Sequence, residues 1–129
     1  MKHVLVFGTF DHLHPGHHFV IEQAQARGRV TVIVARDANV AHIKGFHPDH
    51  SEQERCQAIK NQFPDISVQL GDADDYLQPI RDMQPDLILL GYDQKLPPDI
   101  NEEDLPCPIE RLPAFEPDKF KSSIMRQQL

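Results

Sequence analysis

The sequence predicts an α/β fold of the Rossmann-like type, with a parallel sheet of about five strands and helices on both faces. Short apolar runs alternate along the chain with segments of helical periodicity, as in consecutive β-α-β units. Two of the runs, residues 30–35 and 87–90, are apolar almost throughout, which is typical of parallel strands covered on both faces. At 129 residues, the chain is expected to form a single domain over residues 1–129.

The strands are assigned from short apolar or alternating runs that end at glycine, proline or a charged residue. They are expected at residues 4–7, 30–35, 66–70, 87–90 and 109–112. The last run is short and follows a proline-rich connection, so we expect it at an edge of the sheet.

The helices are assigned from apolar spacing together with start and stop residues. They are expected at residues 15–27, 51–63, 76–83 and 122–129. Pro15 suits the first turn of a helix, where its missing N–H costs nothing. Ser51, with Glu54 three residues later, predicts a capping box. Asp74 or Asp75 is expected to cap the third helix.

Composition and charge exclude several classes of protein. The chain has 13 Lys and Arg against 20 Asp and Glu, a formal net charge of −7. That excludes a nonspecific nucleic-acid binder but not a mononucleotide, which needs only a few local cations. Cys56 and Cys107 have no metal or redox spacing, so both are expected as free thiols. No signal peptide or membrane-spanning run is apparent, so we expect a cytoplasmic protein without a membrane partner.

Ligands of open parallel sheets bind at the carboxyl ends of the strands, so the residues after each strand are candidates for the site. These residues are Thr9, Asp11, His14, His17, Arg36, Asp37, Lys44, Asp72, Asp74, Gly91, Tyr92, Asp93, Lys95, Lys119, Lys121, Ser122, Ser123 and Arg126. Several of the basic residues are thus expected at one edge of the sheet, which favours a phosphate-bearing ligand. Lys44 lies in residues 36–50, a polar segment predicted to be a mobile loop with at most a short helix around residues 38–43.

The turn after the first strand is the strongest signal in the chain. Residues 8–18 contain four histidines within seven residues. A strand that runs through a glycine turn into a helix is a common place for a phosphate, because backbone N–H groups point at it. The chain has neither G-x-G-x-x-G nor G-x-x-x-x-G-K-[ST], which argues against a dehydrogenase or a P-loop protein. We interpret the turn as a nucleotide-phosphate site with histidines as its clamp.

These residues resemble a known family, the cytidylyltransferase-like nucleotidyltransferases. Residues 8–17 match the family signature G-x-F-D-x-x-H-x-G-H, and residues 122–126 resemble its second signature, Ser-Ser/Thr-x-Ile-Arg. Residues 91–93 stand where the family has Gly-x-Asp, and Arg55 stands where it has an arginine. Within the family the chain is most similar to the small archaeal-type FAD synthases and next to bacterial glycerol-3-phosphate cytidylyltransferases.

The resemblance implies the residues of the site. The catalytic residues would be His14, His17, Lys44 and Arg126. The nucleotide-binding residues would be Gly8, Thr9, Phe10, Asp11, Gly16, Arg55, Gly91, Asp93, Ser122 and Ser123. In this scheme Asp93 accepts from an amino group of the base, and Asp11 orients Arg55 or a hydrated Mg²⁺. No metal site made by the protein itself is predicted. A divalent cation is expected to bind through the NTP phosphates, with Mg²⁺ as the first candidate and Mn²⁺ and Co²⁺ as alternatives.

Simpler roles remain open for many of these residues. His14 and His17 could be solvated histidines at a helix cap, and His14 with His18 could be a transition-metal pair. The other simple roles are a solvated loop lysine for Lys44, a turn residue for Asp93, a plain N-cap for Ser123, a helix-surface charge for Arg55, an exposed pair for Arg36 and Asp37, and surface positions for His12 and His18.

The leading hypothesis is an adenylyltransferase that joins ATP and FMN to give FAD and pyrophosphate. The alternative enzyme uses CTP and a small phosphate such as glycerol 3-phosphate. An alternative of another class is a non-catalytic module that binds a nucleotide or a metal. Because the final helix is short and needs a surface to pack on, we also expect a homodimer.

Overall fold

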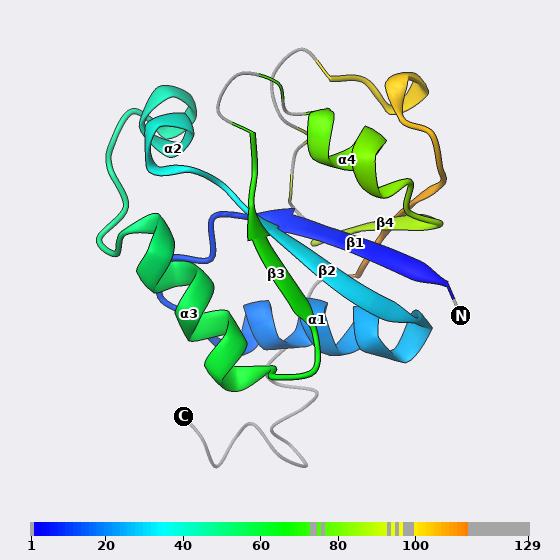
Figure 1. The fold of residues 1–129 in the computed structure, drawn as a ribbon, viewed down its shortest axis with the longest axis horizontal. Helices are drawn as coiled ribbons and strands as arrows, with labels where there is room; N and C mark the ends of the chain where they lie inside the picture. The colour runs from blue at the N-terminus through cyan, green and yellow to red at the C-terminus, as the bar shows by residue number, and fades with distance from the viewer. Residues whose placement is uncertain are drawn as a thin grey trace.

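The computed structural model describes residues 2–72, 75, 77–92, 94, 96 and 100–113, without the side chains of residues 42–44. Within this part of the chain, five strands form one parallel sheet in the order β3-β2-β1-β4-β5 (Figure 1). They are β1 (His3–Gly8), β2 (Arg29–Val34), β3 (Ser67–Leu70), β4 (Leu87–Leu90) and β5 (Ile109–Arg111). The predicted fold class is confirmed, and the last strand lies at an edge of the sheet as expected.

The carboxyl ends of the strands are aligned at one edge of the sheet. Gly8 of β1 pairs with Val34 of β2, and Val34 pairs with Leu70 of β3. On the other side, Leu90 of β4 pairs with Arg111 of β5. The loops that follow the strands therefore start side by side, as a ligand site of this fold requires.

Helices cover both faces of the sheet. They are α1 (Pro15–Arg27), α2 (Asp37–Lys44), α3 (Glu52–Gln62) and α4 (Gln78–Met83), with a 3₁₀ turn at Glu102–Asp104. Figure 1 shows α1 and α3 against one face and α4 against the other. Ile21 and Ile59 pack with Val6 on the first face, whereas Ile80 packs with Leu5 on the second. Neighbouring residues of β1 thus point into opposite cores, as the two-residue period of a strand dictates.

The start and stop residues of the helices act as expected. Pro15 is the first residue of α1. Ser51 Oγ accepts from the Glu54 N–H at 3.1 Å, and the Glu54 carboxylate accepts from the Ser51 N–H at 2.8 Å. This confirms the predicted capping box. Gly45 ends α2 in the left-handed conformation, with φ 81°, which glycine adopts without steric cost.

Two predicted boundaries are wrong. The short helix at residues 38–43 is longer and ends at Lys44, so Lys44 is helical and not part of a loop. A tertiary contact explains why the helix begins at Asp37, because Glu52 of α3 accepts from the Asp37 N–H at 2.8 Å and caps α2. The helix predicted from residue 76 begins at Gln78, because the Asp75 carboxylate accepts from the N–H of residue 77 at 2.9 Å and holds a turn there.

The helix predicted from residue 122 lies outside the described residues. In the part of the chain that the structure describes, no helix combines the length and the apolar character needed to cross a membrane.

Candidate active site

The loop between β1 and α1 places His14 at the start of α1. His14 is the N-cap residue, and its Nδ1 accepts from the Gly16 N–H at 3.1 Å. A ring nitrogen that accepts carries no proton, so the ring N–H of His14 is on Nε2. His14 is exposed, and Nε2 is therefore a donor available to a ligand. The first turn of α1 contains no acidic side chain, so the partial positive charge of the helix end adds to the attraction for an anion.

His14 and His17 form one stacked pair. Their ring centroids are 3.8 Å apart, and the ring planes are inclined by 19°. The His17 ring also contacts Phe10, whose ring centroid is 5.2 Å away. Phe10 is buried, with φ 56°, so a left-handed turn places its ring inside the loop. The two histidines are thus brought together as their spacing predicts, and they present two imidazoles to one place.

Two glycines of the same loop make room for these rings. A Cβ at Gly16 would lie 3.0 Å from Cε1 of His14, and a Cβ at Gly8 would lie 3.1 Å from the ring of Phe10. The family resemblance places Gly16 among the nucleotide-binding residues. The structure adds that any side chain there would displace the imidazole of His14.

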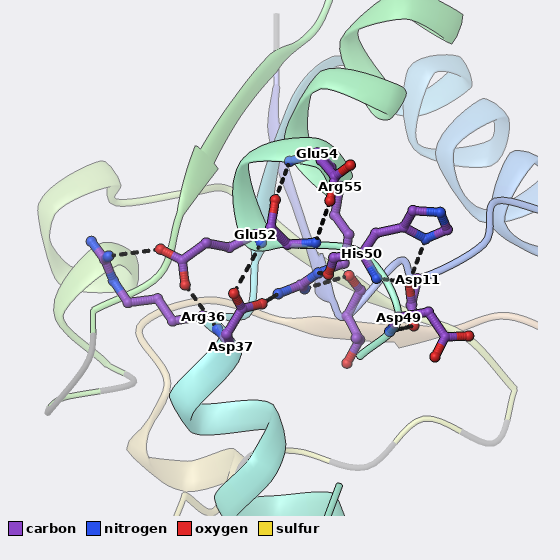
Figure 2. Close-up of polar contacts among 10 residues, drawn as sticks. Asp11, Arg36, Asp37, Asp49, His50, Glu52, Glu54 and Arg55 are labelled. Carbon is purple, nitrogen blue, oxygen red and sulfur yellow. Dashed lines mark hydrogen bonds and ion pairs between the residues drawn. The ribbon is translucent and has the colours of Figure 1, made fainter. Parts of the chain in front are cut away.

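Arg55 of α3 links three segments of the chain: the β1–α1 loop, the start of α2 and the segment before α3 (Figure 2). Its Nη1 donates to the Thr9 carbonyl at 2.8 Å, and its Nε donates to the His50 carbonyl at 3.1 Å. Its Nη2 pairs with Asp37 Oδ1 at 2.5 Å. Arg55 is 1% exposed, so the alternative of a helix-surface charge is wrong. A buried guanidinium is tolerated only with such partners. Here the partners connect α2 and α3 to the β1–α1 loop, which we call the signature loop because it carries the family signature of residues 8–17.

The N-termini of α2 and α3 cap each other. Glu52 Oε1 accepts from the Asp37 N–H at 2.8 Å, and Asp37 Oδ2 accepts from the Glu52 N–H at 3.3 Å (Figure 2). Arg36 adds an ion pair to Glu52 at 3.3 Å and donates to the Gly71 carbonyl at 2.7 Å. The expected exposed pair of Arg36 and Asp37 is therefore wrong, because each residue pairs with α3 instead.

Asp11 binds the segment before α3 through hydrogen bonds and is not among the partners of Arg55 described above. Its carboxylate accepts from the Asp49 N–H at 2.8 Å, the His50 N–H at 3.2 Å and His50 Nδ1 at 2.9 Å (Figure 2). Of the two roles expected for Asp11, orienting Arg55 is wrong, since Asp37 takes that place, and orienting a hydrated Mg²⁺ stays a prediction. Burial alone would raise the pKa of Asp11. The hydrogen bonds from Asp49 and His50, with the nearby His12, outweigh burial and lower this pKa to about 2.

The loop after β4 is anchored by two residues that the sequence did not single out. Gln94 accepts from the Gly91 N–H at 3.1 Å and donates to the Phe7 carbonyl at 2.5 Å, which joins the ends of β4 and β1. Arg111 Nη1, at the end of β5, donates to the carbonyls of Gly91 and Gln94 at 3.0 and 2.6 Å. A signal for Arg111 was available, because it lies near the carboxyl end of the strand predicted at residues 109–112.

Most of the remaining predicted residues fall outside the part of the chain that the structure describes. Those outside the described residues are Asp74, Asp93, Lys95, Lys119, Lys121, Ser122, Ser123 and Arg126, and of Lys44 only the backbone is described. His12 is exposed as expected but pairs with Asp49 at 2.7 Å. His18 packs against Phe63, with 5.1 Å between the ring centroids.

The arrangement is suited to stabilising negative charge on a phosphate. It combines a stacked imidazole pair, the start of a helix and a loop fixed from below by a buried arginine. Fixed donors of this kind are effective catalysts where charge develops in a transition state, because they need no reorganisation during the reaction.

Comparison with known proteins identifies relatives that match most of this chain. FAD synthase of Methanolacinia petrolearia is 37% identical and covers 100% of this chain and 91% of its own length. FAD synthase of Methanosarcina mazei is 40% identical and covers 88% of this chain and 78% of its own length. The crystal structure of the lipopolysaccharide core biosynthesis protein from Thermoplasma volcanium has a TM-score of 0.78 and 30% identity. That match covers 90% of this chain and 99% of the other.

The model of the cytidylyltransferase-like family matches residues 5–127, a range that includes the stacked histidines, the buried arginine, most of β1 and all of β2–β5. With signature, sheet order and site in agreement, the chain belongs to the cytidylyltransferase-like family.

Proposed function

We propose that this protein is an FAD synthase, which transfers the AMP group of ATP to the phosphate of FMN and releases pyrophosphate. The stacked pair of His14 and His17 at the start of α1 supports the reaction class. The choice of substrates is supported by relatives named FAD synthase, which are 37% and 40% identical over 91% and 78% of their length.

The reaction asks for alignment and charge stabilisation. An oxygen of the FMN phosphate forms a bond to the α-phosphorus of ATP, while the bond from that phosphorus to the bridging oxygen breaks. The electron pair leaves with pyrophosphate, so no covalent enzyme intermediate is needed. We assign Nε2–H of His14 and the imidazole of His17 to the phosphate oxygens on which charge accumulates.

The other roles follow the family resemblance and remain predictions. Lys44 and Arg126 would contact the β- and γ-phosphates or the acceptor phosphate, and Ser122 and Ser123 would bind the same end of the nucleotide. Asp93 would accept from the amino group of adenine. Gln94 and Arg111 hold the backbone on either side of Asp93 in place.

Arg55 is better described as a positioning residue than as a nucleotide ligand. Its donors are directed at Thr9, His50 and Asp37, and its side chain is buried. We propose that it acts on the nucleotide through the Thr9 backbone, which it fixes next to the histidine pair.

The test is a substrate matrix that combines ATP or CTP with FMN or glycerol 3-phosphate in the presence of Mg²⁺, Mn²⁺ or Co²⁺. FAD is measured by chromatography and pyrophosphate by a coupled assay. We expect FAD only from ATP and FMN. Turnover of CTP with glycerol 3-phosphate, and not of ATP with FMN, would replace the FAD synthase with a cytidylyltransferase.

A variant distinguishes an enzyme from a binding module. His17→Ala should lower the rate at least ~100-fold while the protein stays folded. A non-catalytic nucleotide- or metal-binding module predicts a different pattern: no pyrophosphate with any acceptor, and a His14→Ala variant that keeps its nucleotide affinity.

Three further predictions rest on the sequence. We propose that the divalent cation enters as part of the nucleotide complex, as substrate. We also propose a homodimer and a cytoplasmic location. Light scattering at several protein concentrations tests the dimer, and omission of the cation from the substrate matrix tests the first proposal.

A further inference from the structure

Three potential metal ligands come together where the β1–α1 loop meets the segment before α3. Asp11, His12 and His50 each offer one ligand atom, and these atoms all lie within 4.8 Å of one another. His50 Nδ1 is 2.9 Å from Asp11 Oδ1, and the rings of His12 and His50 meet edge to face with centroids 4.5 Å apart. The group combines the signature loop with a segment about 38 residues further along the chain.

The carboxylate of the cluster is already oriented. The N–H groups of Asp49 and His50 donate to its two oxygens, and outer hydrogen bonds of this kind fix metal ligands in place. Asp49 Oδ2, at 2.7 Å from His12 Nε2, adds a second negative charge next to the cluster.

The backbone also holds His12 in this place. Its φ is 58°, a left-handed conformation that costs a histidine energy unless its surroundings compensate. The conformation orients the His12 side chain toward residues 49 and 50, as its contacts with both show.

We propose that Asp11, His12 and His50 form a binding site for a divalent transition metal ion of the zinc or cobalt class. Two imidazoles and a carboxylate are ligands that suit such ions. With bonds of about 2.0–2.1 Å, ligand atoms of a tetrahedral site lie roughly 3.3 Å apart. The ligand atoms must therefore move closer by side-chain rotation, and the proton between His50 Nδ1 and Asp11 Oδ1 must leave that position when the ion binds.

The ion would connect the β1–α1 loop to the segment between α2 and α3. It is distinct from the cation carried by the nucleotide, and it does not depend on the proposed function. His14 and His18, the metal pair considered from spacing, are not part of it, since their rings contact His17 and Phe63.

The test uses protein without a histidine tag and without nucleotide. Co²⁺ is added, and binding is followed by visible d–d absorption and by calorimetry, with Zn²⁺ as competitor. We expect one equivalent of Co²⁺ to bind with micromolar affinity and Zn²⁺ to displace it. His12→Asn and His50→Ala should each weaken binding at least ~10-fold. Asparagine is chosen at position 12 because it tolerates the left-handed backbone.

His47→Ala is the matched control, because His47 is an exposed histidine of the same segment. It should leave the affinity unchanged, and thermal melts establish that every variant is folded. Absence of binding, equal affinity in the wild type and in His12→Asn, or loss of binding in His17→Ala alone would each overturn the proposal. These outcomes are independent of FAD formation, so they do not depend on whether the protein is an FAD synthase.

Discussion

The His14 ring is positioned by a hydrogen bond from the backbone of Gly16 and by the neighbouring ring of His17. Its Nδ1 accepts from Gly16, and its ring stacks on His17 at 3.8 Å. At the scale of residues, the position of the His14 imidazole therefore depends on the absence of a side chain at Gly16. The sequence shows that both histidines follow a strand, but only the structure shows that Gly16 keeps the imidazole in position.

Gly16→Ala should separate activity from stability. The added Cβ would lie 3.0 Å from the His14 ring, so the imidazole must move, and a misplaced catalytic group costs at least ~10-fold in kcat/KM. Alanine is a better helix former than glycine, and the free energy of unfolding should not fall by more than about 1 kcal/mol. Steady-state kinetics and urea unfolding measure the two effects. Gln25→Ala, at an exposed site of α1, is the control. Wild-type kinetics in Gly16→Ala would contradict this account of the glycine.

Asp11 should make stability depend on pH in the acid range. Its pKa is about 2 in the folded protein and about 3.9 in an unfolded chain. Between these values the unfolded state binds more protons than the folded state, so the free energy of unfolding falls as pH falls from about 4 to 2. The contribution of Asp11 to stability is fully present above about pH 5. Asp11→Asn should lose this part of the pH dependence, as measured by urea unfolding from pH 7 to 2.

Glu103→Gln, at an exposed position of the 3₁₀ turn, controls for the loss of one negative charge. If the difference in stability between the wild type and Asp11→Asn stayed constant over the whole pH range, the low pKa of Asp11 would be refuted.

At the scale of elements, the site depends on how α2 and α3 meet. Asp37 and Glu52 cap each other's helices, and Arg55 lies between Asp37 and the signature loop. The two helix ends and the β1–α1 loop are therefore one hydrogen-bonded unit. A change in α3 should be felt at the histidine pair, although no residue of α3 needs to touch the ligand.

Arg55→Met should destabilise the protein by about 2–4 kcal/mol, because it leaves the Thr9 and His50 carbonyls without their donor. Arg55→Lys should not restore stability, since one ammonium group cannot reach all three acceptors. Chemical unfolding measures both effects. Arg81→Met, which removes an exposed ion pair with Asp75, should cost less than about 1 kcal/mol. Equal losses in Arg55→Met and Arg81→Met would show that the buried network contributes little.

At the scale of the whole molecule, stability should be highest in the middle of the sheet. β1 is paired on both sides, with β2 and β4, and its residues Val4, Leu5 and Val6 are fully buried. Hydrogen exchange should therefore be slowest in β1 and β2 and faster in β5, the edge strand. Mass spectrometry of exchanged peptides tests this order. Faster exchange in β1 than in β5 would contradict it.

The fold was predictable because its signals are local. Each strand shows as a short apolar or alternating run, and Pro15, Ser51 and Glu54 mark helix starts within one turn. The signature of residues 8–17 likewise carries its own meaning, and the comparisons confirm the family that it indicates.

The tertiary structure decided which partner each charged residue takes. Arg55 reaches Thr9 over 46 positions and Asp37 over 18, and Asp11 reaches His50 over 39. No local pattern encodes such distances, so the sequence alone led to the wrong partner for Asp11 and to an exposed Asp37. The sequence determined the strands, the histidine loop and the family, because these depend on neighbours along the chain. The structure decided the supporting network and the proposed metal site, because burial makes a charge take whichever partner the fold brings near.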